Sequence, residues 1–308
     1  MTERLRLFDA LTFSIRVIRW RPVHAAVYVA VIAILYLLYY AWAASDGGTA
    51  FYTRYADATL GLAAGRAGDY FAMMGVTLLV SLIAGTLFTA GGYRVLLREN
   101  LSPWLPLRLG TDEVRILGLF LIMFAMFLVA MIGAAILLTI VAVALSFALA
   151  GGGPTEQGTA LVGTIASFGM LAVMIAMLYV FGRIAVSLPK SIAERRFSLG
   201  GWTASRGFGL QLLLAHGVLY LVMMVVQFAL APDLLAYTMS GMTGDPALAD
   251  PAAMVEMMTR PYGDMTMLIA PIQAVFMFLL LGPTAAVVSW AGRQADTAGS
   301  ATQSGMQD

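Results

Sequence analysis

Residues with side chains suited to catalysis or metal binding are scarce in this 308-residue chain. Cysteine is absent, which excludes disulfides, thiolate metal sites and cysteine nucleophiles. The two histidines, His24 and His216, each lie near one end of a long apolar stretch. If those stretches were neighbouring helices, the pair could ligate a haem from both faces, but nothing nearby indicates a macrocycle pocket. We interpret both histidines as interfacial side chains and expect no cofactor.

Acid–base catalysis would have to use one group of charged residues. Asp112, Glu113 and Glu194, with the arginines beside them, form the one plausible cluster of acids and bases. They match no catalytic motif, so we assign no catalytic residue and predict that the protein is not an enzyme. A membrane-embedded enzyme built on this cluster is the less favoured alternative.

Methionines concentrate in one connection between apolar stretches. Thioether sulfurs are soft enough to bind monovalent copper, but methionine is also a general filler of apolar faces, and the chain holds 20 of them. We therefore interpret this group as packing residues and assign no metal ligand. Its members are Met239, Met242, Met254, Met257 and Met258.

A third group of residues could bind phosphate. Arginine pairs recognise phosphate through two parallel hydrogen bonds, and tryptophan anchors a segment at the depth of lipid headgroups. The sequence therefore predicts a site for a lipid headgroup or a partner protein, although the same basic residues could serve only to orient the protein in the membrane. The residues are Arg183, Lys190, Glu194, Arg195, Arg196, Trp202 and Arg206.

The composition indicates which structure must position these residues. Sixty per cent of the residues are hydrophobic and 11% are charged, whereas an average soluble domain is roughly 25% charged. A soluble fold cannot bury that much apolar surface, but a lipid bilayer can cover it. The sequence therefore predicts an all-α membrane protein.

Six stretches supply the roughly 20 apolar residues that a helix needs to cross a bilayer. The third has no charged residue over 35 positions, and such a helix is roughly 50 Å long, against about 30 Å of hydrocarbon. We expect that helix to tilt, to bend near Gly133, or to project beyond the membrane. The six predicted transmembrane helices are Val23–Ala44, Tyr70–Gly92, Ile116–Ala150, Thr159–Leu188, Leu210–Ala231 and Met265–Ala291.

The basic residues predict the orientation of these helices. Fifteen of the 18 lysines and arginines lie in the amino-terminal segment, in the connections after the second and fourth stretches, and in the tail. The other three are Arg54, Arg66 and Arg260. Since cytoplasmic loops carry the excess of Lys and Arg, both termini are expected in the cytoplasm of a bacterium, with the helices in its inner membrane.

The regions outside the membrane are predicted to be partly helical. Within residues 1–22, apolar side chains recur every three or four positions from Leu5 to Ile18, which is typical of an amphipathic helix lying in the cytoplasmic interface. Residues 23–291 form the six-helix domain, and the outer connection 232–264 is expected to form short interfacial helices. Residues 292–308 are small and polar, and we expect a disordered cytoplasmic tail.

One stretch has features of a transporter. Pro271, Gln273 and Gly282-Pro283 lie in the sixth stretch, and interrupted helices can open polar backbone to a substrate. However, proline also occurs in helices that are merely kinked, and no acid or base lies near the middle of any stretch, as ion-coupled transport would require. A small-molecule or lipid transporter is therefore the leading alternative function.

The cytoplasmic segments Ala193–Leu199 (AERRFSL) and Gly201–Gly207 (GWTASRG) resemble a loop of uncharacterised bacterial multi-pass membrane proteins. These proteins are related to the glycerophosphoryl diester phosphodiesterase membrane-domain family, and the six-helix layout is similar too, over about residues 5–291. The resemblance implies a membrane module related to lipids or the envelope. It carries over no catalytic residue, because the chain has no soluble phosphodiesterase domain.

Together these features favour a non-enzymatic integral membrane protein that acts as a scaffold or lipid-interacting module. Its expected partners are membrane lipids and, as an alternative, another membrane protein subunit. No feature of the sequence points to nucleic acid.

Overall fold

The computed structural model of the chain describes residues 6–63, 67–98, 109–149, 156–232, 251–260 and 265–304. Over these residues the regular elements are all helices, and six spans are long and apolar enough to cross a membrane. The predicted all-α, multi-pass membrane fold is therefore confirmed. The spans are Pro22–Ala43, Ala67–Leu97, Thr111–Val141, Leu171–Ala193, Gly209–Leu230 and Thr266–Arg293.

Two breaks between consecutive helices fall within predicted membrane spans. The fourth span breaks at Val186, between α6 and α7, and the sixth breaks at Leu281, between α12 and α13. The helices are α1 (Leu7–Trp20), α2 (Pro22–Ala43), α3 (Asp46–Ala63), α4 (Ala67–Leu97), α5 (Thr111–Leu149), α6 (Glu156–Ala185), α7 (Ser187–Ala193), α8 (Gly201–Ala204), α9 (Gly209–Leu230), α11 (Pro251–Thr259), α12 (Thr266–Leu280) and α13 (Gly282–Ser304).

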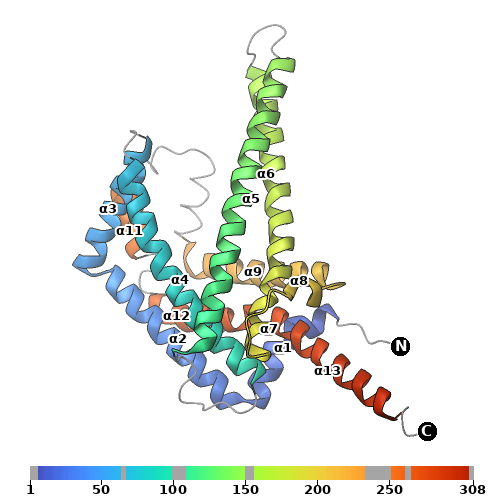
Figure 1. Cartoon of the computed structure of the whole chain (residues 1–308). Helices are drawn as coiled ribbons and strands as arrows, with labels where there is room; N and C mark the ends of the chain where they lie inside the picture. The colour runs from blue at the N-terminus through green and yellow to red at the C-terminus, as the bar shows by residue number, and fades with distance from the viewer. Residues whose placement is uncertain are drawn as a thin grey trace.

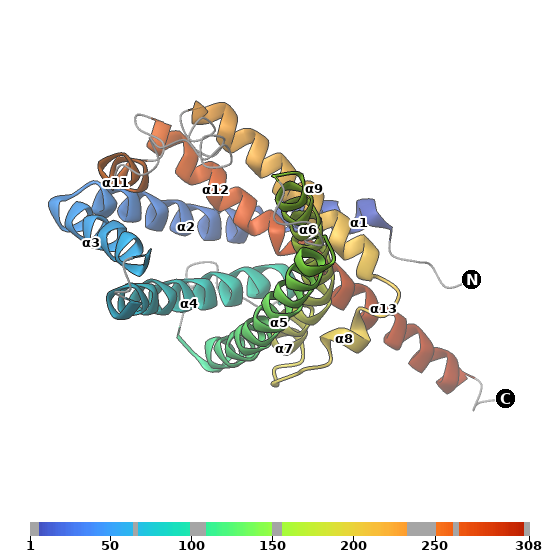
Figure 2. The ribbon, with the colours of Figure 1, turned by 90° about the horizontal axis from the view of Figure 1, so that it is seen from above.

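The long helices form two groups. Helix α12 packs against both α2 and α9 and lies between them, as the view from above shows (Figure 2). Helices α5 and α6 pack against each other as a long pair that projects away from the rest (Figure 1). Helix α5 runs as one helix of 39 residues through Gly133.

Helix α1 forms as predicted, but its most buried residues lie beside the predicted apolar face. Its buried residues are Ala10, Phe13, Ser14 and Val17, whereas Phe8, from the predicted apolar face, is 72% exposed. The small side chains of Ala10 and Ser14 permit a close approach: a Cβ at Gly282 would overlap Ser14 Oγ. Leu11 and Ile18 of the predicted apolar face also pack against the core, so the prediction located part of the contact face and left out its small side chains.

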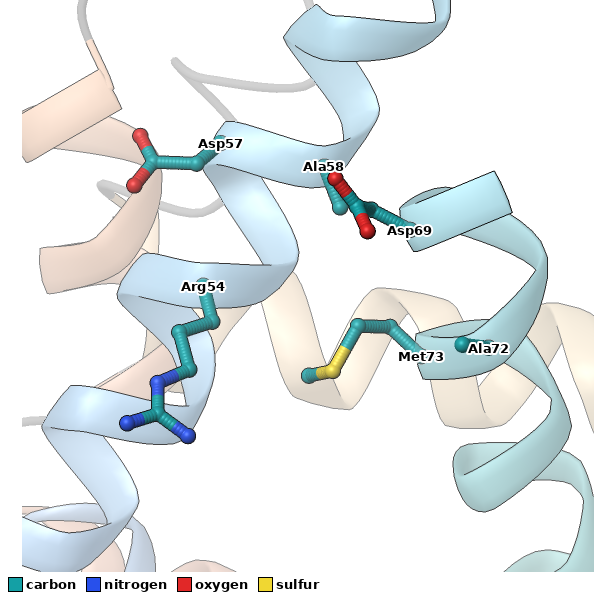
Figure 3. Close-up of a pocket in the computed structure, with 6 residues that line it drawn as sticks. All are labelled: Arg54, Asp57, Ala58, Asp69, Ala72 and Met73. Carbon is teal, nitrogen blue, oxygen red and sulfur yellow. The ribbon is translucent and has the colours of Figure 1, made fainter. Parts of the chain in front are cut away.

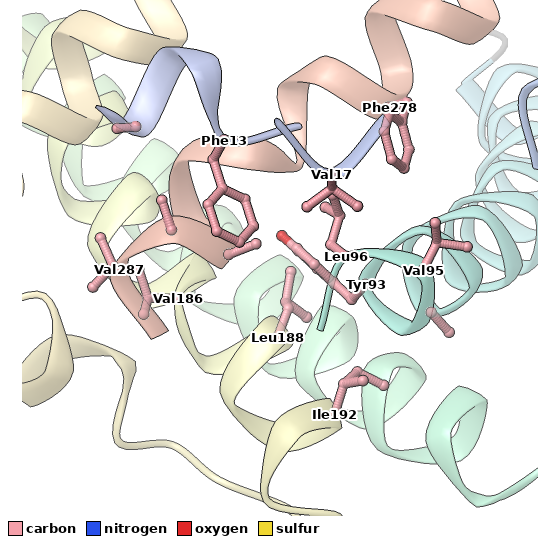
Figure 4. Packing of buried hydrophobic residues seen from close by; sticks show 14 of the residues in the cluster. Phe13, Val17, Tyr93, Val95, Leu96, Val186, Leu188, Ile192, Phe278 and Val287 are labelled. Carbon is pink, nitrogen blue, oxygen red and sulfur yellow. The ribbon is translucent and has the colours of Figure 1, made fainter. Parts of the chain in front are cut away.

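The hydrophobic core draws residues from α1, α2, α4, α5, α7, α9, α12 and α13 and lies at the end of the molecule where α2 and α5 begin and α4 ends. Elsewhere the long helices expose apolar side chains such as Val129 of α5 and Leu221 of α9, as expected of helices that face lipid. Figure 4 shows the converging side chains. They come from α1 (Phe13, Val17), α4 (Tyr93, Val95, Leu96), the start and body of α7 (Val186, Leu188, Ile192), α12 (Phe278) and α13 (Val287).

Two segments outside the predicted spans differ from expectation. Residues 292–304, expected to be disordered, continue α13 as far as Ser304, because four alanines between 291 and 301 favour helix. Helix α3, between the first and second spans, was not predicted.

The connection between the fifth and sixth spans contains α11, which begins at Pro251. Residues 233–250, including Met239 and Met242, and residues 261–264 lie outside the described part of the chain.

Candidate functional site: a basic surface at one end of the helices

A buried ion-pair cluster joins α4 to α5 at the core end of the molecule. Arg94, near the end of α4, has a fully buried side chain, and its Nε lies 3.1 Å from Asp112 Oδ2. Its Nη2 pairs with Glu113. Both acids lie in the first turn of α5, where negative charge also favours the positive end of the helix dipole.

Two further arginines complete this cluster from its exposed edge. Arg98 donates to both oxygens of Asp112, at 2.8 and 2.9 Å, and Arg115 donates to Oδ1 at 2.8 Å. Arg98 also donates to the carbonyl of Ile192, at 3.2 Å, which ties the cluster to α7. Asp112 therefore accepts hydrogen bonds from three arginines.

Arg21 links the cluster to the junction of α1 and α2. Its Nη1 donates to the carbonyls of Val95, in the last turn of α4, and of Arg98, the residue after that helix. Carbonyls at the end of a helix have no partner within it. A cation at the end of a helix is also favoured by the helix dipole. The cluster thus fastens α1, α4, α5 and α7 together around the core.

Asp112, Glu113 and Glu194 are the acids that the sequence suggested for acid–base chemistry, and all three are paired with basic side chains. Asp112 and Glu113 do come together, but arginines hold both, and Glu194 pairs separately. A carboxylate in such a setting is suited to hold helices in place. Sequence reasoning had assigned Arg94 and Arg98 to membrane orientation alone, although their i, i+4 spacing would place them on one helix face.

The second part of the surface is the connection between α7 and α9. Glu194 accepts hydrogen bonds from Lys190, at 2.7 Å, and from Arg196, at 2.9 Å. The hydrogen bond from Lys190, followed by that from Arg196, lowers the pKa of Glu194 below its ordinary value. Arg196 itself remains 73% exposed, so part of its guanidinium still faces outward.

Arg183, at the end of α6, reaches across to α8. Its guanidinium lies over the indole of Trp202, with Cζ 3.7 Å from the ring centroid, and its Nη2 donates to the Trp202 carbonyl at 2.8 Å. Its Nε donates to Ser205 Oγ at 3.2 Å. Arg183 therefore pairs with Trp202 and Ser205.

Close backbone contacts fix this connection in place. The amide of Gly201 donates to Ser187 Oγ at 3.0 Å, and a Cβ at Gly201 would overlap the Ser187 backbone nitrogen. Ser191 Oγ accepts from the Ser198 amide at 3.0 Å. Arg195 adopts a left-handed backbone conformation with φ of 54°, which turns the chain sharply after α7.

The remaining predicted residues are free to bind a ligand. The side chains of Arg195 and Arg206 are exposed and have no ionic or hydrogen-bond partner in the described part of the chain. Exposed apolar side chains accompany them: Phe197, Leu199 and Trp202. We call residues 194–206 together with Arg183 the basic loop. It presents both positive charge and apolar side chains outward.

The interrupted sixth span does not show the polar opening expected of a transporter at Gln273. Gln273 is buried on α12, and its Oε1 accepts a hydrogen bond from the hydroxyl of Tyr40 on α2, at 2.5 Å. Close packing surrounds the break at Leu281, since a Cβ at Gly92 would overlap the Leu281 side chain. The glutamine thus fastens α2 to α12.

The histidines are not placed as a haem pair. His24 lies on α2 and His216 on α9, and α12 lies between these helices (Figure 2). His216 Nδ1 is 2.8 Å from the carbonyl of Leu212, one turn earlier in its own helix.

A shallow cavity of about 300 Å³ lies between α3 and α4, at the opposite end of α4 from the basic loop (Figure 3). Arg54 and Asp57 of α3, and Asp69 and Met73 of α4, are among the residues that line it. The three charged residues are all exposed, so water can solvate them without a ligand. We assign no ligand to this cavity.

Comparison with known proteins gave no matching family model, no matching curated protein and no matching solved structure.

Proposed function

We propose that the protein is a lipid-interacting module of the bacterial inner membrane, with the basic loop at the cytoplasmic surface as its site for anionic headgroups. The observation that carries this proposal is the exposure of Arg195 and Arg206, without protein partners in the described part of the chain, beside the exposed side chains of Leu199 and Trp202. Basic residues near an anionic surface contribute about 1 kcal/mol each. The apolar side chains would enter the interface between headgroups and hydrocarbon.

The ordered backbone of the loop also supports this role. A segment that served only to orient the protein needs positive charge and no fixed geometry. Here, hydrogen bonds at Gly201 and Ser191 fix the loop backbone, and the stack on Trp202 fixes Arg183. Fixed arginines lose less conformational entropy on binding phosphate than mobile ones do.

The module is proposed to act without catalysis, as a scaffold that gathers anionic lipids or a lipid-associated partner subunit. The resemblance of the loop to the membrane-domain family is consistent with that role. A buried, hydrogen-bonded Gln273 gives the transporter alternative no specific support.

Lipid retention in native mass spectrometry tests the proposal. The full chain is purified in mild detergent from membranes of mixed phosphatidylethanolamine and phosphatidylglycerol, and bound lipids are identified by mass. The double variant Arg195→Gln/Arg206→Gln removes two charges without breaking a protein ion pair, so it should retain clearly less phosphatidylglycerol than wild type. The matched control is Arg54→Gln/Arg260→Gln, which removes two exposed arginines predicted to lie on the outer side. Equal phosphatidylglycerol retention by both double variants and wild type would overturn the proposal.

A further inference from the structure

An apolar groove runs between α5 and α6, and its volume is about 230 Å³. The small side chains of alanines on both helices leave the space open. Phe181 forms part of the wall and also packs against Phe127, with ring centroids 6.0 Å apart. Its lining is apolar throughout and includes Met126, Ala130, Val173, Ala176, Val180 and Phe181.

The groove leads toward the basic loop. On α6, Val173, Ala176 and Val180 are spaced by three and four residues, so they follow one side of the helix. Arg183 comes three residues after Val180, roughly 4.5 Å further along the axis. Arg183 contacts Trp202 and Ser205. Arg206 directly follows Ser205 in the chain.

We infer that this groove and the basic loop together bind one anionic phospholipid, with an acyl chain in the groove and the phosphate at Arg183 and Arg206. The inference rests on the proposed function and names the ligand of the same site. Charge selects the occupant: an uncharged hydrocarbon would fill the groove alone, whereas a phospholipid with net negative charge also meets two guanidinium groups.

The dimensions agree with a lipid chain. From residue 173 to residue 181 the groove follows α6 for roughly 12 Å, close to the roughly 15 Å of hydrocarbon in one leaflet. The bilayer interior is as apolar as the groove, so an acyl chain gains no hydrophobic free energy by entering it. The free energy of binding comes instead from packing contacts and from the contacts of the phosphate. The groove therefore acts mainly by selecting and orienting a lipid already in the membrane.

The test compares variants of the groove with variants of the loop. Ala176→Trp fills the groove from α6 and Ala130→Leu fills it from α5. Leu178→Trp serves as the control because its side chain is exposed on α6 and does not line the groove. Each full-length variant is titrated with phosphatidylglycerol in detergent, and bound lipid is counted by native mass spectrometry.

We expect both groove-filling variants to weaken phosphatidylglycerol binding about threefold or more, through lost packing contacts, and Leu178→Trp to leave it unchanged. If Ala176→Trp, Ala130→Leu and Leu178→Trp all bind like wild type while Arg195→Gln/Arg206→Gln loses lipid, the groove assignment fails and the proposed function stands. If the arginine variant also binds like wild type, the proposed function fails. A change from dimer to monomer mass in the groove variants would instead identify a contact between two copies and contradict the lipid assignment.

Discussion

The guanidinium of Arg183 lies over the indole of Trp202, with 3.7 Å between Cζ and the ring centroid, and joins the end of α6 to α8. The same arginine donates to the Trp202 carbonyl, so the contact fixes both the side chain and the backbone of the loop. The basic loop is thereby held in a fixed shape, as the proposed lipid site requires.

Replacing Trp202 should loosen this surface. Trp202→Leu removes the stack, which is worth about 0.5–1 kcal/mol at an exposed position, and should increase proteolysis within residues 194–206. Trp202→Phe keeps an aromatic face and should remain close to wild type. Limited proteolysis in detergent measures the difference, and equal cleavage of both variants would argue against the stack as a constraint.

Arg94 should be essential for stability. Arg94→Met leaves Glu113 buried without its cation, and breaking a buried ion pair typically costs about 3–5 kcal/mol. Thermal unfolding in detergent should show a large loss for this variant, and the double variant Arg94→Met/Glu113→Met should recover part of it. Arg54→Met, an exposed change on α3, is the matched control. If the two single variants unfold alike, Arg94 does not fasten the helices.

Gly201 should tolerate no side chain. A Cβ there would overlap the Ser187 nitrogen and lie 2.8 Å from the Ile184 carbonyl oxygen, and both are backbone atoms that cannot turn aside. Gly201→Ala should therefore lower the midpoint of thermal unfolding. Gly217→Ala on α9, where nothing lies within 4 Å, should be neutral or stabilising by up to about 1 kcal/mol. The opposite order of stabilities would contradict the close contact between α7 and α8.

Glu194 should restrain the basic loop, and acid should release it. Its pKa is lowered, chiefly by the hydrogen bond from Lys190, so its ion pairs contribute above its ordinary pKa of 4.5 and are lost as pH falls through the lowered value. Glu194→Gln should reproduce the released state at neutral pH, because Lys190 and Arg196 then become available to phosphate. We expect this variant to retain more phosphatidylglycerol at pH 7 than wild type, as measured by native mass spectrometry. Unchanged or weaker retention would show that Glu194 does not compete with lipid.

The sequence was sufficient to predict the membrane class, the number of spans and their approximate bounds, because an apolar run of about 20 residues has the length that a helix needs to cross the hydrocarbon core. These features depend on local composition.

Features that depend on contacts between distant segments were not predictable. The burial of Arg94 against Glu113, the turning of Ser14 toward the α12–α13 break, and the pairing of Arg183 with Trp202 all join residues from different helices. From the sequence alone, Arg94 and Arg183 could be counted only as positive charges near the ends of predicted helices. The sequence therefore located the basic loop but could not separate the arginines that hold the fold from those that remain free.

The depth of residue 199 in a bilayer shows whether the basic loop lies among lipid headgroups. Because the chain has no cysteine, Leu199→Cys gives a single site for a nitroxide label, and Leu221→Cys on α9 gives a reference within a membrane span. Protein in nanodiscs containing phosphatidylglycerol is studied by power-saturation electron paramagnetic resonance with oxygen and a water-soluble nickel complex. We predict that the label at 199 lies at headgroup depth, shallower than the label at 221 and clearly less accessible to nickel than one in water. A label at 199 that is as accessible to nickel as one in bulk water would contradict the account.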